Sequence, residues 1–261
     1  MGLEHLIKTN HNISKIDQEN KKIKLNFENN EIFECDYLII SDGVFSKSKS
    51  LISNNQIQPR FNKMLAIRGT IPNSKKIDCK NISLFLGPDF HQVIYPVNPR
   101  GDLNFIAILK YNLSINEQKN HLLFNDDNFV KKILDYIPLE MREFLNEIKQ
   151  LKIFPVFISN NFFKLKNDNI HFIGDAFFAF PPSFAQGASQ SIEGAYELFK
   201  SIENKTENSY LKNRVSKIRM VNNRSKFNQF AFHLSSPLTT FLRNIFLKKL
   251  VKNKKFLENY L

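Results

Sequence analysis

One strand-turn-helix segment carries the side chains best suited to hold a ligand. The run Ile170–Ile173 is apolar and predicts a buried strand, and Gly174-Asp175 follows it directly. An aspartate just beyond a strand can accept hydrogen bonds from sugar-like hydroxyl groups. Further along, Gln186-Gly187-Ala188 opens a predicted helix, and the free N–H groups at a helix N-terminus attract anions. From these residues alone, a structural turn explains Gly-Asp about as well as a binding site does.

A second strand end of the same kind lies earlier in the chain. The all-apolar run Tyr37–Ile40 predicts a strand covered on both faces, and it ends in Ser41-Asp42-Gly43. Alternating apolar residues around Asn29-Asn30 predict a hairpin just before it. Asp42 and Gly43 are therefore either ligand-facing residues or a turn at a strand end.

The middle of the chain predicts a sheet of short antiparallel strands. Four strand-like runs separated by Pro, Gly and Asn lie between residues 64 and 110. Arg68 and Tyr95 stand in two of these runs, where they could face a substrate cavity; a surface arginine and a core tyrosine are the alternatives. Residues 116–150 favour helices interrupted at Pro138.

Positive charge is concentrated near the end of the chain. The 261 residues carry a net charge of +12, and residues 211–261 hold twelve Lys/Arg against the single acidic Glu258. This pattern fits a solvated helical face, an anionic membrane surface or nucleic acid. We expect helices packed on the body with Lys and Arg facing solvent, weak or no membrane binding, and no nucleic acid, because no nucleic-acid motif is present.

The overall composition excludes several protein classes. No apolar run approaches the roughly 18 residues of a membrane span, and the start lacks a secretory pattern, so we expect a cytoplasmic protein. The two cysteines, Cys35 and Cys79, are too few to build a metal site. We therefore expect no bound metal ion.

Together these segments resemble the class A flavoprotein monooxygenases of the salicylate and para-hydroxybenzoate hydroxylase type. The second FAD-binding motif of that family has Gly-Asp-Ala, then Pro, then Gly-Gln-Gly. This chain has Gly174-Asp175-Ala176, Pro181-Pro182 and Gln186-Gly187, with Phe177-Phe178 in place of a small residue and a histidine. The family's Asp-Gly motif is matched at Asp42-Gly43.

The resemblance implies an α/β (α+β) protein: an incomplete FAD-binding Rossmann-like domain, an antiparallel-sheet substrate domain and C-terminal helices. Residues 1–57 and 155–205 are expected to form the partial FAD-binding domain. Residues 58–154 are expected to form the substrate-binding sheet domain, and residues 206–261 the C-terminal basic helices. It implies FAD as cofactor, NAD(P)H as transient reductant, and O₂ with a small aromatic substrate as partners. The implied FAD-binding residues are Gly174, Asp175, Ala176, Pro182, Gln186, Gly187, Ala188, Asp42 and Gly43. No catalytic residue is identified.

One family feature is missing from these residues. The family's phosphate loop is Gly-x-Gly-x-x-Gly, and no two of the eight glycines have Gly-x-Gly spacing. We therefore expect a truncated or split member that hydroxylates nothing alone, with a separate N-terminal FAD-binding chain as a candidate partner. The alternatives are a non-catalytic remnant or interaction protein without flavin, and a basic surface-binding module.

Overall fold

The chain forms two compact units of mixed α/β structure. The computed structural model describes residues 2–19, 22–53, 58–72, 81–159, 161–162, 169–250 and 252, so Cys79 lies outside the described residues. One unit comprises residues 1–60 and 157–225, and the other comprises 61–156 and 226–261. The predicted class, with antiparallel sheets and C-terminal helices, is confirmed.

The first unit begins with a three-stranded antiparallel sheet. Its strands are β1 (Ile13–Glu19), β2 (Lys22–Phe27) and β3 (Ile32–Cys35), in that order. The β2–β3 hairpin confirms the prediction. The sequence did not predict β1, because Ile13 and Ile16 are three residues apart and do not alternate; the register shift between Ile13 and Lys15 absorbs that spacing.

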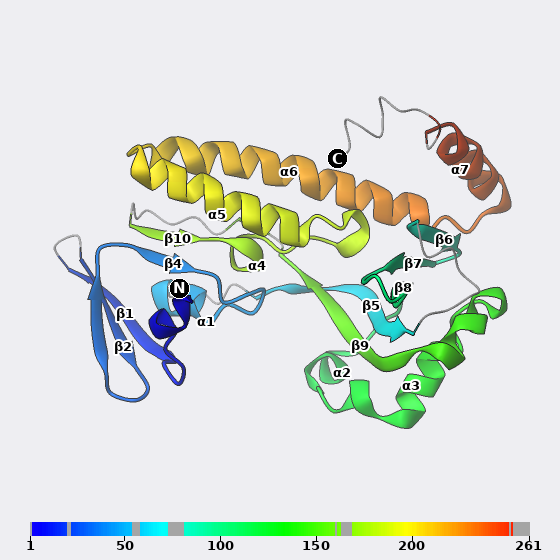
Figure 1. Ribbon diagram of the computed structural model, residues 1–261, viewed down its shortest axis with the longest axis horizontal. Coiled ribbons are helices and arrows are strands. Elements are labelled where there is room, and N and C mark those ends of the chain that lie inside the picture. Colours follow the sequence, from blue (N-terminus) through cyan, green and yellow to red (C-terminus); the bar gives the residue numbers. More distant parts are fainter. Residues whose placement is uncertain are drawn as a thin grey trace. The chain divides into compact units, whose positions relative to one another are not determined.

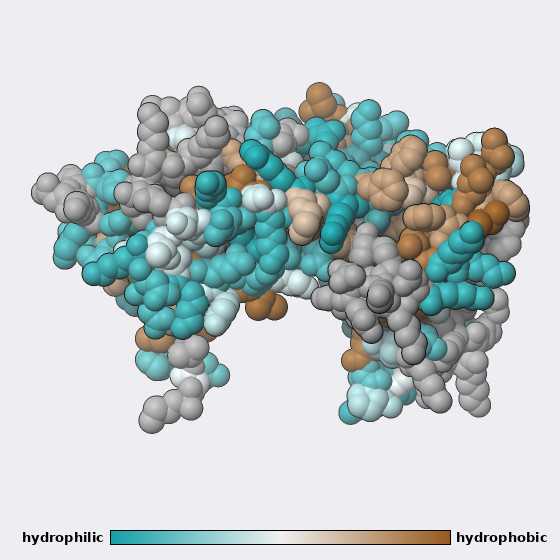
Figure 2. Space-filling view, turned by 90° about the horizontal axis from the view of Figure 1, so that it is seen from above, coloured by the Kyte–Doolittle hydropathy of each residue, from teal (hydrophilic) through white to brown (hydrophobic). Residues whose placement is uncertain are grey.

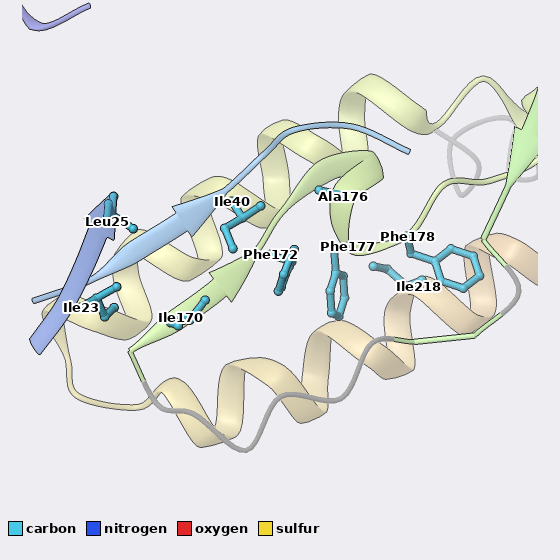
Figure 3. Packing of buried hydrophobic residues seen from close by; sticks show 9 residues of the cluster. All are labelled: Ile23, Leu25, Ile40, Ile170, Phe172, Ala176, Phe177, Phe178 and Ile218. Carbon is cyan, nitrogen blue, oxygen red and sulfur yellow. The ribbon is translucent and has the colours of Figure 1, made fainter. Parts of the chain in front are cut away.

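A parallel strand pair forms the centre of this unit. β4 (Leu38–Ile40) pairs in register with β10 (Ile170–Phe172), and the Ile173 N–H extends the ladder by donating to the Ile40 carbonyl over 2.9 Å. A buried apolar cluster packs around this pair (Figure 3), and its members are Ile23, Leu25, Ile40, Ile170, Phe172, Ala176, Phe177, Phe178 and Ile218.

Helices complete the first unit. They are η1 (Leu3–Leu6), α1 (Lys47–Ile52), α4 (Gly174–Phe177), η4 (Pro182–Phe184), α5 (Gly187–Glu203) and α6 (Glu207–Phe232), whose residues after Ser225 belong to the second unit. α5 and α6 run side by side (Figure 1). Buried Arg214 of α6 joins them by donating to the Gln190 carbonyl and, over 3.2 Å, to Glu197. Gly194 permits this packing, since a Cβ there would lie 3.0 Å from the Arg214 Nε.

The second unit is built on a five-stranded sheet. Its order is β6 (Ser83–Gly87), β7 (Phe90–Pro96), β8 (Leu103–Lys110), β5 (Arg60–Ile71) and β9 (Lys149–Ile158). The β6–β7, β7–β8 and β8–β5 pairings are antiparallel, as predicted. One face is apolar and fully buried, and includes Ile67, Ile71, Phe90, Ile94, Leu103 and Phe105.

Short helices and one longer helix accompany this sheet. They are α2 (Ile115–Lys119), η2 (Leu123–Asn125), α3 (Asp127–Leu134), η3 (Leu139–Glu147) and α7 (Pro237–Leu250). Helical spacing in residues 116–150 predicts one side that carries Leu122, Leu123, Phe129, Ile133, Leu134 and Ile137. Phe129, Ile133 and Ile137 are buried as that pattern requires, but Leu122 is 80% exposed. Leu122 lies in the turn before η2 and not on the face of a continuous helix, so helical spacing does not apply to it.

Candidate functional site

The parallel pair brings the two predicted strand ends to one edge. Because β4 and β10 run in the same direction and in register, Asp42-Gly43 and Gly174-Asp175 both leave the carboxyl edge of this small sheet. Ligands of open α/β sheets bind at that edge. Residues far apart in the sequence thus meet where a ligand is expected.

Asp175 presents a carboxylate without a partner among the described residues. Its side chain is solvent-accessible in α4, and the surrounding protein raises its pKa by desolvation. Gly174 before it has φ +58°, and a Cβ there would lie 3.1 Å from the Ser191 Oγ. The positive φ favours glycine at 174, and the close approach to Ser191 leaves little room for a larger residue.

The N-terminal half of α5 lies beside the Gly174-Asp175 turn. Gly174 closely approaches Ser191, the fifth residue of α5, so the turn adjoins the half of the helix that lies toward the positive end of its dipole. Gln186, the N-cap, makes no side-chain capping bond. A Cβ on Gly187 would meet nothing within 4 Å, which leaves open space against the backbone, and Ala188 is exposed. The first N–H groups of α5 have no partner within the helix.

The loop between α4 and α5 is held by hydrogen bonds to other segments. The Ala179 N–H donates to the Ser159 hydroxyl, and the Ser159 N–H donates to the Ala179 carbonyl, each over 3.0 Å. The Ser225 hydroxyl donates to the Pro181 carbonyl. Pro182, exposed, starts η4, and Ala185 takes φ +53° to lead into Gln186. The loop therefore has a defined path into the helix.

The side chains of three residues of the motif lie in the core. Ala176, Phe177 and Phe178 are all buried in the cluster of Figure 3. The Phe162 ring lies 5.9 Å from the Phe177 ring and 4.8 Å from the Phe178 ring. The Ala176 methyl group is enclosed by the cluster, and the two phenylalanines make this turn apolar.

Asp42 is engaged in the fold. Its carboxylate accepts a hydrogen bond from the Ser48 N–H over 3.1 Å, and Ser46 accepts one from the Lys49 N–H, so both cap α1. Gly43 has φ +82° with open space beside it. Burial lowers the pKa of Lys49, although the nearby Asp42 carboxylate acts in the opposite direction. The Lys49 Nζ lies 5.9 Å from the centre of the Phe172 ring. The turn interpretation of Asp42 accounts for its contacts.

In the second unit, Arg68 and Tyr95 share one face of the sheet. Tyr95 lies opposite Asn104, and Asn104 lies opposite Thr70. Directly opposed residues have side chains on the same face, and Arg68 is two residues from Thr70 on β5, so it points the same way. Both residues predicted for the substrate pocket therefore belong to the face opposite the apolar core.

A hollow of about 220 Å³ lies on this face. It is lined by Arg68, Gly69, Thr70, Asn104, Gln150, Lys152 and Phe154. This lining contains two cations and no carboxylate. The Asn104 Nδ2 is buried and has no hydrogen-bond partner among the described residues. Sequence reasoning missed Asn104 and Lys152, because only strand pairing places them beside Arg68.

Comparison with known proteins assigns the family. Residues 6–209, more than half of the chain, match the family described as "FAD binding domain". The chain belongs to this family. The "FAD-dependent monooxygenase pigN" of Monascus ruber is 31% identical over 104 residues, which are 36% of this chain and 23% of that protein.

Solved structures share the fold of this FAD-binding domain protein. HpxO of Klebsiella pneumoniae, in complex with FAD and uric acid, has a TM-score of 0.71 at 13% identity and covers 92% of this chain. The 2,6-dihydroxypyridine-3-hydroxylase of Arthrobacter nicotinovorans has a TM-score of 0.75 at 14% identity and covers 87% of this chain. A salicylate hydroxylase substrate complex has a TM-score of 0.72 at 17% identity and covers 92% of this chain. The chain spans 64%, 65% and 66% of these proteins. The resemblance to class A FAD-dependent aromatic monooxygenases is confirmed.

The residues at the strand edge fit the chemistry of FAD. A partly desolvated, unpartnered carboxylate at Asp175 suits the hydroxyl groups of a sugar-like chain. The bare backbone at Gly187 and the α5 dipole suit an electronegative ring edge or an anion. No group of three or more His, Cys, Asp or Glu side chains in the described residues could hold a metal ion. In the same residues, no helix has the length and apolarity needed to cross a membrane.

Proposed function

We propose that this FAD-binding domain protein is the FAD- and substrate-binding part of a monooxygenase that hydroxylates a small aromatic or similar compound. NAD(P)H is the proposed reductant and O₂ the co-substrate. The observation that carries the proposal is the meeting of Gly174-Asp175 and Gly43 at one sheet edge, with the N-terminal half of α5 against Gly174. Family membership supports FAD as the ligand there.

Each residue at the edge has a defined task. Asp175 accepts hydrogen bonds from ligand hydroxyls. Gly187 lets the ligand approach the backbone, and the N–H groups of the first turn, Gly187 to Ser189, stabilise negative charge next to them. Bound FAD would supply the redox chemistry, taking electrons from NAD(P)H and activating O₂.

The hollow on the second unit is the proposed substrate site. Arg68 and Lys152 favour an anionic substituent such as a carboxylate, and the buried Asn104 amide can donate to the same group. Phe154, 45% exposed at the rim, offers an apolar surface for a ring. These features favour an aromatic acid over a neutral aromatic compound.

FAD also needs a site for its two phosphate groups. No glycines in these 261 residues have the Gly-x-Gly spacing of the usual phosphate loop. We propose that a strand-turn-helix segment carrying that loop, in the same or a separate chain, raises FAD affinity. A set of charge-assisted phosphate contacts contributes several kcal/mol, or several powers of ten in affinity.

FAD titration, followed by quenching of flavin fluorescence, tests the site. Asp175→Ala should weaken binding about ten- to hundredfold, since a hydrogen bond to a charged group contributes about 1.5–3 kcal/mol. Asp17→Ala is the control, because Asp17 lies in the same unit and its surface ion pair with Lys15 contributes little to the stability of the fold. Equal FAD affinity of the wild type and Asp175→Ala would reject the site.

A second assay separates the enzyme from a flavin-free interaction protein. With the phosphate-loop segment added, the enzyme hypothesis predicts yellow protein whose NAD(P)H oxidation is stimulated by an aromatic acid. Protein that stays colourless at saturating FAD with that segment present would favour the non-catalytic alternative.

A further inference from the structure

Helix α7 exposes most of its large apolar side chains, unlike a typical helix of a globular protein. Its side toward the rest of the unit comprises Thr239, Thr240, Arg243, Leu247 and Leu250, all buried or half-buried. Its outer side comprises Leu238, Phe241, Leu242, Ile245 and Phe246, which are between 42% and 68% exposed. A helix of a globular protein normally points such an apolar stripe at the core.

Arg243 shows that the orientation is specific. Its guanidinium is buried and donates through Nη1 to the Phe232 carbonyl over 3.1 Å, at the end of α6. Nε donates to the Asn244 side chain over 3.1 Å. The bond to Phe232 holds the Arg243 side of α7 against α6, and the five apolar residues lie on the other side of the helix.

The exposed residues form a stripe suited to a large apolar partner. Positions 238, 241, 242, 245 and 246 follow helical spacing and lie on one side. Phe227 and Phe230 in the last turns of α6 are also 61% and 68% exposed. Figure 2 shows brown, hydrophobic side chains gathered at the right-hand end of the molecule, where α7 lies. Contiguous exposed apolar patches mark interaction sites.

Charge identifies the kind of partner. The exposed residues Lys248, Lys249 and Lys252 follow the stripe, and residues 208–257 contain twelve Lys/Arg and no Asp or Glu. Two copies of this surface would repel each other. An apolar stripe rich in Phe and Leu, next to lysines, matches a bilayer surface with anionic headgroups, into which such helices insert their apolar side.

We propose that α7 docks this protein on an anionic membrane surface, with Phe241 and its neighbours in the headgroup region and the lysines on the lipid phosphates. The expectation of weak binding from the sequence assumed that the apolar residues of this region pack on the body. The structure points them outward, and this apolar contribution is not screened by salt.

Co-sedimentation of the 261-residue chain with vesicles of phosphatidylcholine, with and without phosphatidylserine, tests the proposal. The wild type should bind the anionic vesicles and retain part of that binding at moderate salt. Phe241→Ser should weaken binding about tenfold or more, because a phenylalanine ring leaves the apolar phase. Phe199→Ser in α5 is the matched control, since Phe199 is 58% and Phe241 62% exposed, and it should bind like the wild type.

Lys248→Gln with Lys249→Gln should weaken binding to anionic vesicles roughly ten- to thirtyfold. Either of two outcomes would overturn the proposal: absence of vesicle binding at low salt, or equal binding by Phe241→Ser and the wild type. A lower unfolding midpoint together with equal binding would show that the ring packs within the protein. Capture of an acidic protein without any vesicle binding would assign the surface to a protein partner instead.

Discussion

His91 and His233 make the stability of the second unit depend on pH. The His91 Nδ1 lies 2.7 Å from the His233 Nε2, and both rings are buried. Burial lowers the pKa of His91 to about 3, with a further contribution from His233. Burial also lowers the pKa of His233 to about 4, although Asp89 opposes this shift and Lys110 adds to it. Both rings are therefore neutral in the folded protein near neutral pH.

Acidification should destabilise the folded state through this pair. Both histidines have an ordinary pKa of 6.5, so below that pH the unfolded chain binds protons that the folded chain does not. The neutral histidine pair stabilises the folded state fully above pH 6.5, and this stabilisation is lost as the pH falls toward 4. Each histidine contributes about 1.4 kcal/mol per pH unit in that window. Between about pH 7 and pH 5 the pair should lower the free energy of unfolding by about 4 kcal/mol, a large part of the usual 5–15 kcal/mol.

Urea unfolding near pH 7 and pH 5 measures this loss. The double variant His91→Leu/His233→Leu is the comparison, because its carboxylates titrate as in the wild type and only the pair is gone. The wild type should lose more free energy of unfolding between the two pH values, by about 4 kcal/mol. The same loss in both proteins would show that the buried pair does not resist protonation.

Four further substitutions test three separate features. Gly194→Ala should lower the free energy of unfolding by about 1–3 kcal/mol, since its Cβ would lie 3.0 Å from the buried Arg214; urea unfolding measures it. Ala185→Gly should raise it by roughly 0.5–1 kcal/mol in the same assay, because φ +53° is strained for alanine. Arg68→Ala and Lys152→Ala should each raise the KM for an aromatic acid about tenfold and leave that for a neutral analogue unchanged in steady-state NAD(P)H oxidation.

Local sequence patterns were sufficient for most elements of the fold. Alternating residues predicted the β2–β3 hairpin and the strands between residues 64 and 110, and the start of α5 follows Gln186-Gly187 as predicted. These patterns work because the period of the apolar residues distinguishes a strand from a helix. β1 was not predicted, because its bulge interrupts the alternation of apolar and polar residues.

The residues of the candidate site were named from sequence, but their arrangement was not. Pairing of β4 with β10 places Gly43 and Asp175 at one edge, and such long-range pairing leaves no trace in either segment alone. Likewise, Asn104 and Lys152 join Arg68 only through strand order.

The direction in which side chains face was decided by tertiary structure alone. The spacing of apolar residues in α7 predicted a helix with one apolar side, and spacing cannot say whether that side points inward. The bond from buried Arg243 to the Phe232 carbonyl turns it outward. Phe177 and Phe178 show the converse, because a core around β4 and β10 draws them inward from a segment that resembles a polar turn. Periodicity is a property of the chain, whereas facing depends on contacts with residues distant in sequence.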